Sequence, residues 1–193
     1  MAIAGLVLLG ATGRGEVSAQ ATVPAQLGAP APAQPPGGGG SDGLSPAGAL
    51  RLGPVTKLPL PRYVSLRADE INVRRGPGLT YRMDWVFRRE GLPVRIIGEH
   101  GDWRQIEDSD KASGWVYHSL LTGRRTVLVT AEVATLFRRP EADADVAAMA
   151  EQGVVAHLRE CNRDWCEIDA GGAVGWVPKP VLWGVDPGEL WPR

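Results

Sequence analysis

The sequence holds two cysteines, Cys161 and Cys166, five positions apart at the ends of a predicted hairpin turn. Two thiols so close together favour a disulfide when a chain is exported, and an N-terminal segment described below predicts export. Strand pairing complicates this bond, because pairing Leu158 with Ile168 on the core face puts Glu160 opposite Cys166. Cys161 would then lie at the edge of the loop, so the bond needs an irregular turn. We predict the disulfide, which would stabilise the fold by about 2 kcal/mol through closing so short a loop.

The same cysteines could instead bind zinc, with His157 as a third ligand. In one strand His157 and Cys161 would lie ~13 Å apart at ~3.3 Å per residue. Zinc ligands, by contrast, approach the metal to ~2.0–2.3 Å. We therefore predict no metal site and no cofactor.

The sequence contains no recognisable pattern of catalytic residues. The histidines, His100, His118 and His157, lie in no motif with a serine or cysteine nucleophile. There is no nucleotide-binding loop, and Asp143 and Asp145 fall in a predicted surface loop. We predict a protein that is not an enzyme, with a hydrolase as the less supported alternative.

An internal repeat contains four of the seven tryptophans and defines the elements that position them. The segment 91–107, GLPVRIIGEHGDWRQIE, aligns without gaps on the segment 153–169, GVVAHLRECNRDWCEID. Arg-Gly-Pro at 75–77 precedes the first segment, as Arg-Arg-Pro at 138–140 precedes the second. Gly-Trp-Val follows each segment. Three landmarks in the same order, at offsets of 61 to 63 residues, predict a duplicated domain.

Both copies consist of short apolar alternations broken by Gly, Asp and Asn, which is typical of many short strands. The only helix-like run, 144–152, is assigned to a loop. We therefore predict an all-β protein. Its domains are expected at 61–123 and 124–185, followed by a tail at 186–193.

Each copy resembles the bacterial SH3 domain in four successive features. These are the Arg-Gly-Pro or Arg-Arg-Pro loop, an apolar strand, Asp-Trp-x-x-Ile and Gly-Trp-Val. The resemblance implies two tandem small SH3-like barrels, each with a long first loop. It also implies recognition, in this family often of cell-wall peptide or envelope proteins. A polyproline ligand is not expected, because Leu120 and Val181 stand where the eukaryotic relatives have an aromatic residue.

Strand parity predicts where the tryptophans point. If Ile106 fills the core, Trp103, three residues earlier, faces outward. If Val116 fills the core, Trp115 also faces outward, and the second copy follows the same parity. Two outward tryptophans on adjacent strands could form an aromatic binding surface. Alternatively, the first loop or the other copy covers them.

The predicted ligand-binding residues are these tryptophans and the polar or aromatic side chains near them. They are Asn72, Arg74, Arg75, Tyr81, Trp103, Trp115, Tyr117 and His118 in the first copy, and Trp165 and Trp176 in the second. The nearby counterparts in the second copy are Thr135, Phe137 and Lys179. The second copy therefore offers fewer polar groups. We predict that the first copy recognises the ligand and that the second is more structural.

The N-terminal third has the composition of an exported, tethered protein. The run AIAGLVLLGA at 2–11 suits the apolar core of a signal peptide, and Ala19-Gln20-Ala21 suits cleavage after Ala21. No basic residue precedes the run, so a start further upstream is an alternative. Residues 22–60 are rich in Ala, Pro and Gly, which predicts a disordered linker. We expect a periplasmic or secreted protein.

The net charge of −1 gives no reason to expect nucleic acid as a partner. An apolar run of about ten residues is too short for a stable membrane span. Residues 62–125 hold 12 basic and 9 acidic side chains, whereas 126–185 hold 5 and 9. Three interpretations of this charge difference are open. It could be ordinary variation of surface charge, it could make the two halves attract each other, or it could give the first half a preference for an anionic ligand. The expected partner is peptidoglycan or an envelope protein.

Overall fold

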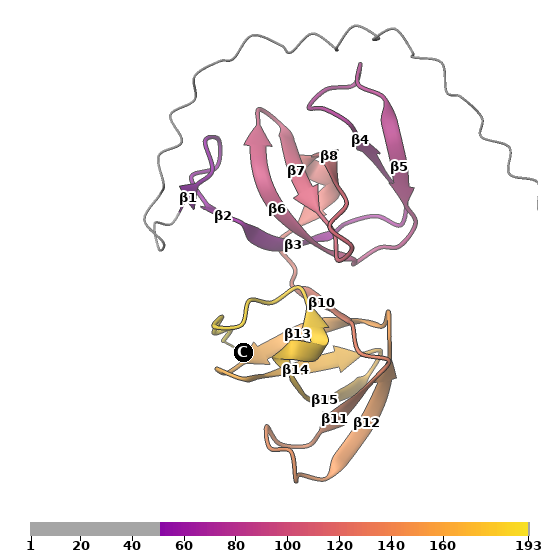
Figure 1. Cartoon of the computed structure of the whole chain (residues 1–193), viewed down its shortest axis with the longest axis vertical. Helices are drawn as coiled ribbons and strands as arrows, with labels where there is room; N and C mark the ends of the chain where they lie inside the picture. The colour runs from indigo at the N-terminus through magenta and orange to yellow at the C-terminus, as the bar shows by residue number, and fades with distance from the viewer. Residues whose placement is uncertain (1–50, 193) are drawn as a thin grey trace, which may run out of the picture. The chain divides into compact units, whose positions relative to one another are not determined.

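The computed structural model describes residues 51–192, which form two seven-stranded sheets and a short N-terminal hairpin (Figure 1). The hairpin consists of β1 (Arg51–Leu52) and β2 (Pro59–Leu60). The first barrel contains β3 (Arg62–Leu66), β4 (Ile71–Arg74), β5 (Met83–Phe87), β6 (Pro93–His100), β7 (Trp103–Glu107), β8 (Ser113–Tyr117), the 3₁₀ turn η1 (His118–Leu120) and β9 (Leu121–Thr122). The prediction of an all-β fold with tandem SH3-like barrels is confirmed.

The second barrel repeats the first, element for element. It contains β10 (Thr126–Val129), β11 (Val133–Phe137), β12 (Val146–Glu151), β13 (Val155–Cys161), β14 (Trp165–Ala170), β15 (Ala173–Pro178), the 3₁₀ turn η2 (Lys179–Val181) and β16 (Leu182–Trp183). The strand order is β5-β4-β8-β7-β6-β3-β9 in the first sheet and β12-β11-β15-β14-β13-β10-β16 in the second. The two orders are identical when equivalent strands are matched, so the sequence repeat is also a repeat of topology.

Each barrel has its own apolar core, formed by the alternate residues of its strands. In β4, Ile71 and Val73 are fully buried, whereas Asn72 between them is exposed. The first core consists of Leu60, Leu66, Ile71, Val73, Val94, Ile96, Ile106, Val116 and Leu121. The second contains Val127, Val129, Leu136, Leu158, Cys161, Cys166, Ile168, Val177 and Leu182 among others. The two cores are separate clusters, as expected for two domains.

A β-bulge in β13 brings the two cysteines together. Leu158 pairs with Ile168, but the register then shifts, so that Glu160 pairs with Glu167 and Cys161 with Cys166. The disulfide Cys161–Cys166 is present, as predicted. The irregularity lies in the strand and not in the turn, because the extra residue of a bulge moves every later pair by one position. The first barrel has the same bulge in β6, between Ile96 and Gly98.

The structure differs from the sequence-based expectation at residues 51–60, which form the hairpin β1–β2 and not a linker. The cause is the fully buried carboxylate of Glu99 in β6. It accepts hydrogen bonds from the backbone N–H groups of Val55 and Thr56, from the Thr56 hydroxyl at 2.6 Å and from the Arg62 guanidinium at 2.9 Å. The predicted signal peptide at 1–21 and the rest of the linker lie outside the described residues.

Two further segments differ from their expected structure. The helix-like run forms β12, because pairing with β11 overrides the helix preference of its alanines. The C-terminal tail is not separate from the second barrel: Trp191 pairs with Cys161 through two backbone hydrogen bonds of 2.8 and 3.1 Å. In addition, Arg125 binds Glu189 at 2.5 Å. Among residues 51–192, no helix is long and apolar enough to cross a membrane.

We predict that an added methyl group at the glycine of either Gly-Trp-Val destabilises its barrel. A Cβ on Gly114 would lie 2.4 Å from Val73 Cγ1, and one on Gly175 would lie 2.8 Å from Leu136 Cβ. Overpacking of this kind costs about 1–3 kcal/mol, so urea unfolding of Gly114→Ala and Gly175→Ala should show that loss. Gly123→Ala is the control, since a Cβ there meets none of the described atoms within 4 Å. Equal stability of the Gly114 and Gly123 variants would contradict the prediction.

We also predict that Glu99 makes the first barrel sensitive to acid. Burial alone would raise the pKa of Glu99, but the hydrogen bonds from Thr56, Arg62 and Val55 lower it to about 2. In the unfolded chain the pKa of this carboxylate is near 4.5, so the ionised group stabilises the fold at pH values above 4.5. This contribution is lost as the pH falls towards 2. Glu99→Gln should lower the free energy of unfolding by about 2 kcal/mol at pH 7.

The same variant should flatten the decline in stability between pH 5 and pH 2, measured by urea titration at each pH. Exposed Glu70→Gln is the matched control, because the Glu70 side chain is 63% exposed. An unchanged pH profile for Glu99→Gln would show that another group causes the acid sensitivity.

Candidate functional site

The strands β7 and β8 place three aromatic side chains on the outer side of the first barrel. Trp103 pairs with Tyr117, and Trp115 pairs with Gln105, so these side chains share one side of the sheet. Arg104 and Ile106 alternate with them and are buried on the other side. The rings of Trp103 and Tyr117 pack edge to face, with centroids 5.6 Å apart. We call Trp103, Trp115 and Tyr117 the aromatic face.

Arg74 extends the aromatic face and closes the loop beside it. In the sheet Arg74 pairs with Trp115. Its guanidinium donates to the carbonyls of Leu79 at 2.9 Å and Tyr81 at 2.7 Å. The Tyr81 ring, 48% exposed, covers Gly76, where a Cβ would lie 2.5 Å from it. Arg74 therefore holds the loop 75–82 next to the tryptophans.

The remaining predicted residues of the first copy lie around this surface. Asn72 is exposed on β4, two residues before Arg74 and on the same side. Arg75 is bound to Asp84 at 3.3 Å, and Arg82 binds the same carboxylate at 2.8 Å. The hydrogen bond from Arg82, with that from Arg75, lowers the pKa of Asp84. Arg75 is thus one of two cations on a single carboxylate.

His118 lies at the edge of the aromatic face, beside an acidic residue that the sequence analysis missed. Its backbone N–H donates to the Asp102 carbonyl at 2.9 Å, and its Nε2 lies 3.9 Å from Asp102 Oδ1. The Tyr117 hydroxyl donates to Asp102 Oδ2 at 3.3 Å. The available signal was the Asp-Trp dipeptide, present in both copies. We call Asp102, Trp103, Tyr117 and His118 the Asp102 corner.

In the second barrel the equivalent surface is more apolar. Trp165 pairs with Pro178, and Trp176 pairs with Glu167 and with Phe137 of β11. Phe137 takes the position of Arg74 and packs edge to face on Trp165, with centroids 5.7 Å apart. Apolar residues thus replace both Arg74 and Tyr117. This agrees with the expectation that the second copy has fewer polar groups near its tryptophans.

Lys179, the counterpart of His118, is buried next to Trp165. Its ammonium donates to the carbonyls of Arg163 at 3.0 Å, Pro187 at 3.2 Å and Glu189 at 2.6 Å. Burial lowers the pKa of Lys179, against the opposing effect of the carboxylates of Glu189 and Asp164. A positive charge is thereby enclosed between the second barrel and the C-terminal tail.

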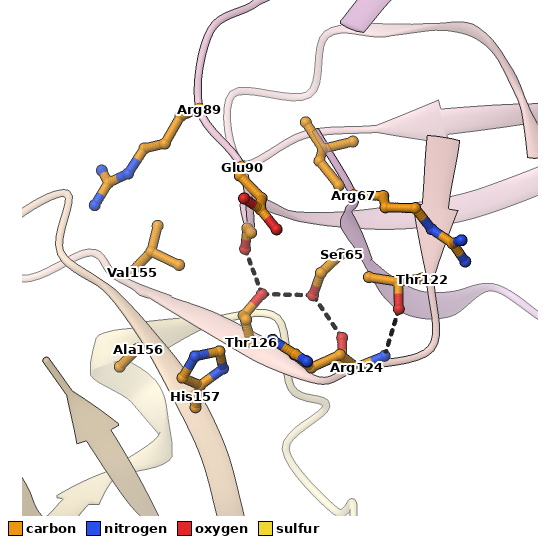
Figure 2. A pocket seen from close by; sticks show the side chains of 12 residues that line it. Ser65, Arg67, Arg89, Glu90, Thr122, Arg124, Thr126, Val155, Ala156 and His157 are labelled. Carbon is orange, nitrogen blue, oxygen red and sulfur yellow. Dashed lines mark hydrogen bonds between the residues drawn. The ribbon is translucent and has the colours of Figure 1, made fainter. Parts of the chain in front are cut away.

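Hydrogen bonds connect β3 of the first barrel to β10 of the second, as Figure 2 shows. The Thr126 hydroxyl donates to the Gly91 carbonyl at 2.6 Å and lies 2.6 Å from the Ser65 hydroxyl. Beside them, Trp183 packs edge to face on Tyr63 at 5.4 Å. Trp183, which is not among the residues predicted for binding, thus contacts the first barrel.

The pocket drawn in Figure 2, of about 640 Å³, opens at this junction. Its charged residues are Arg67, Arg89, Glu90 and Arg124, and His157 also lines it. Figure 2 shows that Arg67 and Arg89 point in opposite directions, with Glu90 between them. Arg89 donates to the Gly153 carbonyl at 2.7 Å. Because these cations do not converge, we interpret the pocket as part of the junction.

Within residues 51–192, no three His, Cys, Asp or Glu side chains are grouped so that they could hold a metal ion. His157 pairs with Asp169 and Thr126 in the sheet, away from the disulfide. Both cysteines are in the disulfide, so they are not zinc ligands.

Comparison with known proteins shows matches to both copies. The sequence model described as "Bacterial SH3 domain" matches residues 67–123 and 130–184. A protein of Bacillus subtilis (strain 168) named "Putative N-acetylmuramoyl-L-alanine amidase YrvJ" is 30% identical over 123 residues. The match covers 58% of this chain and 24% of that protein, so the chain spans about a quarter of that relative's length.

Similar solved structures are NlpC2 and NlpC1 from Trichomonas vaginalis. NlpC2 is 14% identical with a TM-score of 0.31, over 65% of this chain and 50% of that chain. NlpC1 is 13% identical with a TM-score of 0.31, over 68% of this chain and 48% of that chain.

Proposed function

Because this chain belongs to the bacterial SH3 domain family, we propose that it is an exported, non-enzymatic binding protein that recognises a cell-envelope ligand. The ligand is the peptide part of peptidoglycan or an envelope protein. The observation that carries the proposal is the aromatic face of the first barrel. It is partly exposed, lies beside Arg74 and Asn72, and is flanked by Asp102.

Aromatic rings with polar groups at their edges suit a peptide ligand in two ways. Tryptophan and tyrosine offer large contact areas with little loss of side-chain entropy. The exposed polar groups, Asn72 and Asp102, could fix the orientation of a bound backbone. Tyr117 is 38% exposed, so its ring is accessible. In the second barrel Phe137 and Pro178 replace Arg74 and Tyr117, which supports a role for the first barrel as the reader.

The relative named as an amidase of N-acetylmuramoyl-L-alanine supports a cell-wall ligand. That protein is about four times longer than the matched part, so the shared region is one portion of a larger chain. We therefore consider as a second function an accessory subunit that positions a cell-wall enzyme. In both cases the barrels bind and a different protein or domain performs the chemistry.

The proposal predicts that residues 22–193 sediment with purified peptidoglycan sacculi. Trp103→Ala should weaken this binding about ten-fold or more, because a tryptophan at the centre of an interface typically contributes at least 1.4 kcal/mol. Trp165→Ala, the equivalent change in the second barrel, is the matched control and should bind like the parent chain. The bound fraction is measured against sacculus concentration, with thermal unfolding of each variant to confirm folding.

Three outcomes would contradict parts of the proposal. If the parent chain stays in the supernatant while cross-linking in cells captures one discrete protein, the ligand is an envelope protein and not the cell wall. If Trp103→Ala and Trp165→Ala bind equally well, the first barrel is not the reader. Clearing of a peptidoglycan zymogram by the parent chain would show that the protein is a hydrolase.

A further inference from the structure

The outermost two strands of each sheet form equivalent hairpins in the two barrels (Figure 1). Residues 70–89 contain β4 and β5, and residues 133–152, offset by 63 positions, contain β11 and β12. Both hairpins have a β-bulge at the same place, where Asp84 is the extra residue in the first and Ala147 in the second. The backbone is thus repeated. We call residues 70–89 the first edge hairpin and residues 133–152 the second edge hairpin.

Equivalent positions in the two edge hairpins carry charges of opposite sign. The first edge hairpin holds five basic and two acidic residues, whereas the second holds two basic and four acidic residues. Arg82 precedes β5 and Arg88 follows it. Their counterparts at the ends of β12 are Asp145 and Glu151, and all four residues are exposed. The two hairpins therefore share a backbone but differ in the sign of the charge at both ends of the outer strand.

The cations of the first edge hairpin are only partly balanced inside their own barrel. Arg75 and Arg82 lie 3.3 and 2.8 Å from the same Asp84 carboxylate. Arg88 lies 3.6 Å from Glu70, and both side chains of this pair are exposed. Exposed ion pairs of this kind are weak, because water and salt screen them. This hairpin therefore presents net positive charge to the solvent.

The acidic side chains of the second edge hairpin are balanced even less. Arg139 lies 3.8 Å from Glu141, and both side chains are exposed. Among residues 51–192, Asp145 and Glu151 form no ion pair, and no ion pair joins the two edge hairpins. The positive charge of the first hairpin and the negative charge of the second therefore remain available to a partner.

Exposed apolar side chains lie between the charged positions of both edge hairpins. In the first, Leu79 is 78% exposed, and Tyr81 and Met83 are about half exposed. In the second, Met149 is 70% exposed and Val146 is about half exposed. Exposed apolar side chains surrounded by charged groups are typical of a surface that contacts another protein.

The charge pattern selects the partner of each edge hairpin. If β5 of one copy lies antiparallel to β12 of another, Arg82 faces Glu151 and, at the other end of the strands, Arg88 faces Asp145. In a parallel approach each arginine would again face an acidic residue. Two copies of β5 would place arginines opposite each other in either direction, and two copies of β12 would do the same with acidic residues. The charges therefore favour contact between unlike hairpins.

We propose that the first edge hairpin of one copy of this chain binds the second edge hairpin of another copy. Opposite charges meet at the ends of the two outer strands, and the exposed apolar side chains meet between them. Because the two surfaces differ, the contact is heterologous. It gives a closed dimer if both pairs of hairpins meet, and a longer row of molecules if they do not. The inference goes beyond the proposed function and concerns a surface other than the aromatic face.

The test measures the association of residues 22–193 by sedimentation velocity over a range of protein concentrations. The salt concentration is about 0.1 M, where charges interact over ~10 Å. An acidic variant carries Arg82→Glu and Arg88→Glu, and a basic variant carries Asp145→Arg and Glu151→Arg. The parent chain should associate, and each variant alone should associate about ten-fold more weakly, because like charges then face each other. A parent chain that remains monomeric at every concentration would refute the proposal.

An equimolar mixture of the two variants distinguishes recognition by charge from damage to the fold. The acidic variant has acidic residues at all four positions and the basic variant has basic ones, so the mixture should regain the association of the parent chain. The matched control carries Asp110→Arg and Asp186→Arg, which change the net charge as much as the basic variant does. Both residues are exposed and lie outside the edge hairpins, so this control should associate like the parent. A mixture that associates no better than its components, or a control as weak as the basic variant, would contradict the inference.

Sacculus binding distinguishes a failure of this inference from a failure of the proposed function, because none of the four substituted residues belongs to the aromatic face. If the parent chain binds sacculi but stays monomeric, the proposed function holds and the inference of self-association is wrong. If the parent chain associates through the edge hairpins but binds no sacculi, the inference holds and the cell-wall ligand is wrong.

Discussion

The pairing of β7 with β8 is the constraint on which the rest of each barrel depends. Ile106 lies opposite Gly114, and because Gly114 has no side chain, Val73 of β4 and Trp85 of β5 can approach it closely. The same register sends Trp103 and Tyr117 to the outer side. One pairing therefore determines both the close packing of the core and the position of the aromatic face, as the equivalent pairing of β14 with β15 does in the second barrel.

Each barrel is extended by a peripheral segment that a buried charge holds in place. Glu99 binds the N-terminal hairpin through Thr56 and Arg62, and Lys179 binds the C-terminal tail through backbone carbonyls. A buried charge stabilises such an attachment only when every partner is present. The segments are therefore attached through particular hydrogen bonds, and a small barrel gains buried surface that its own strands could not supply.

Duplication has produced two copies with one backbone and different surfaces. The replacement of Arg74 by Phe137, of Tyr117 by Pro178 and of His118 by Lys179 turns an open polar edge into a closed one. In the second barrel the disulfide and the tail add further constraints. We interpret the second barrel as a structural support for the first.

The sequence by itself determined the duplication, the all-β class, the outward parity of the tryptophans and the disulfide, because each depends on local periodicity or spacing. It did not reveal the bulge in β13, the hairpin at 51–60 or the docked tail. The hairpin and the tail depend on partners far away in the chain, 43 residues for Glu99 with Thr56 and 30 residues for Cys161 with Trp191. The bulge is an irregularity in the pairing of β13 with β14, which the alternation of residue types does not show. One interpretation of the excess of basic residues in the first half was an anionic ligand. The fold, however, places the acidic Asp102 at the edge of the aromatic face. Only the tertiary structure decides which charges share a surface and which are buried and balanced.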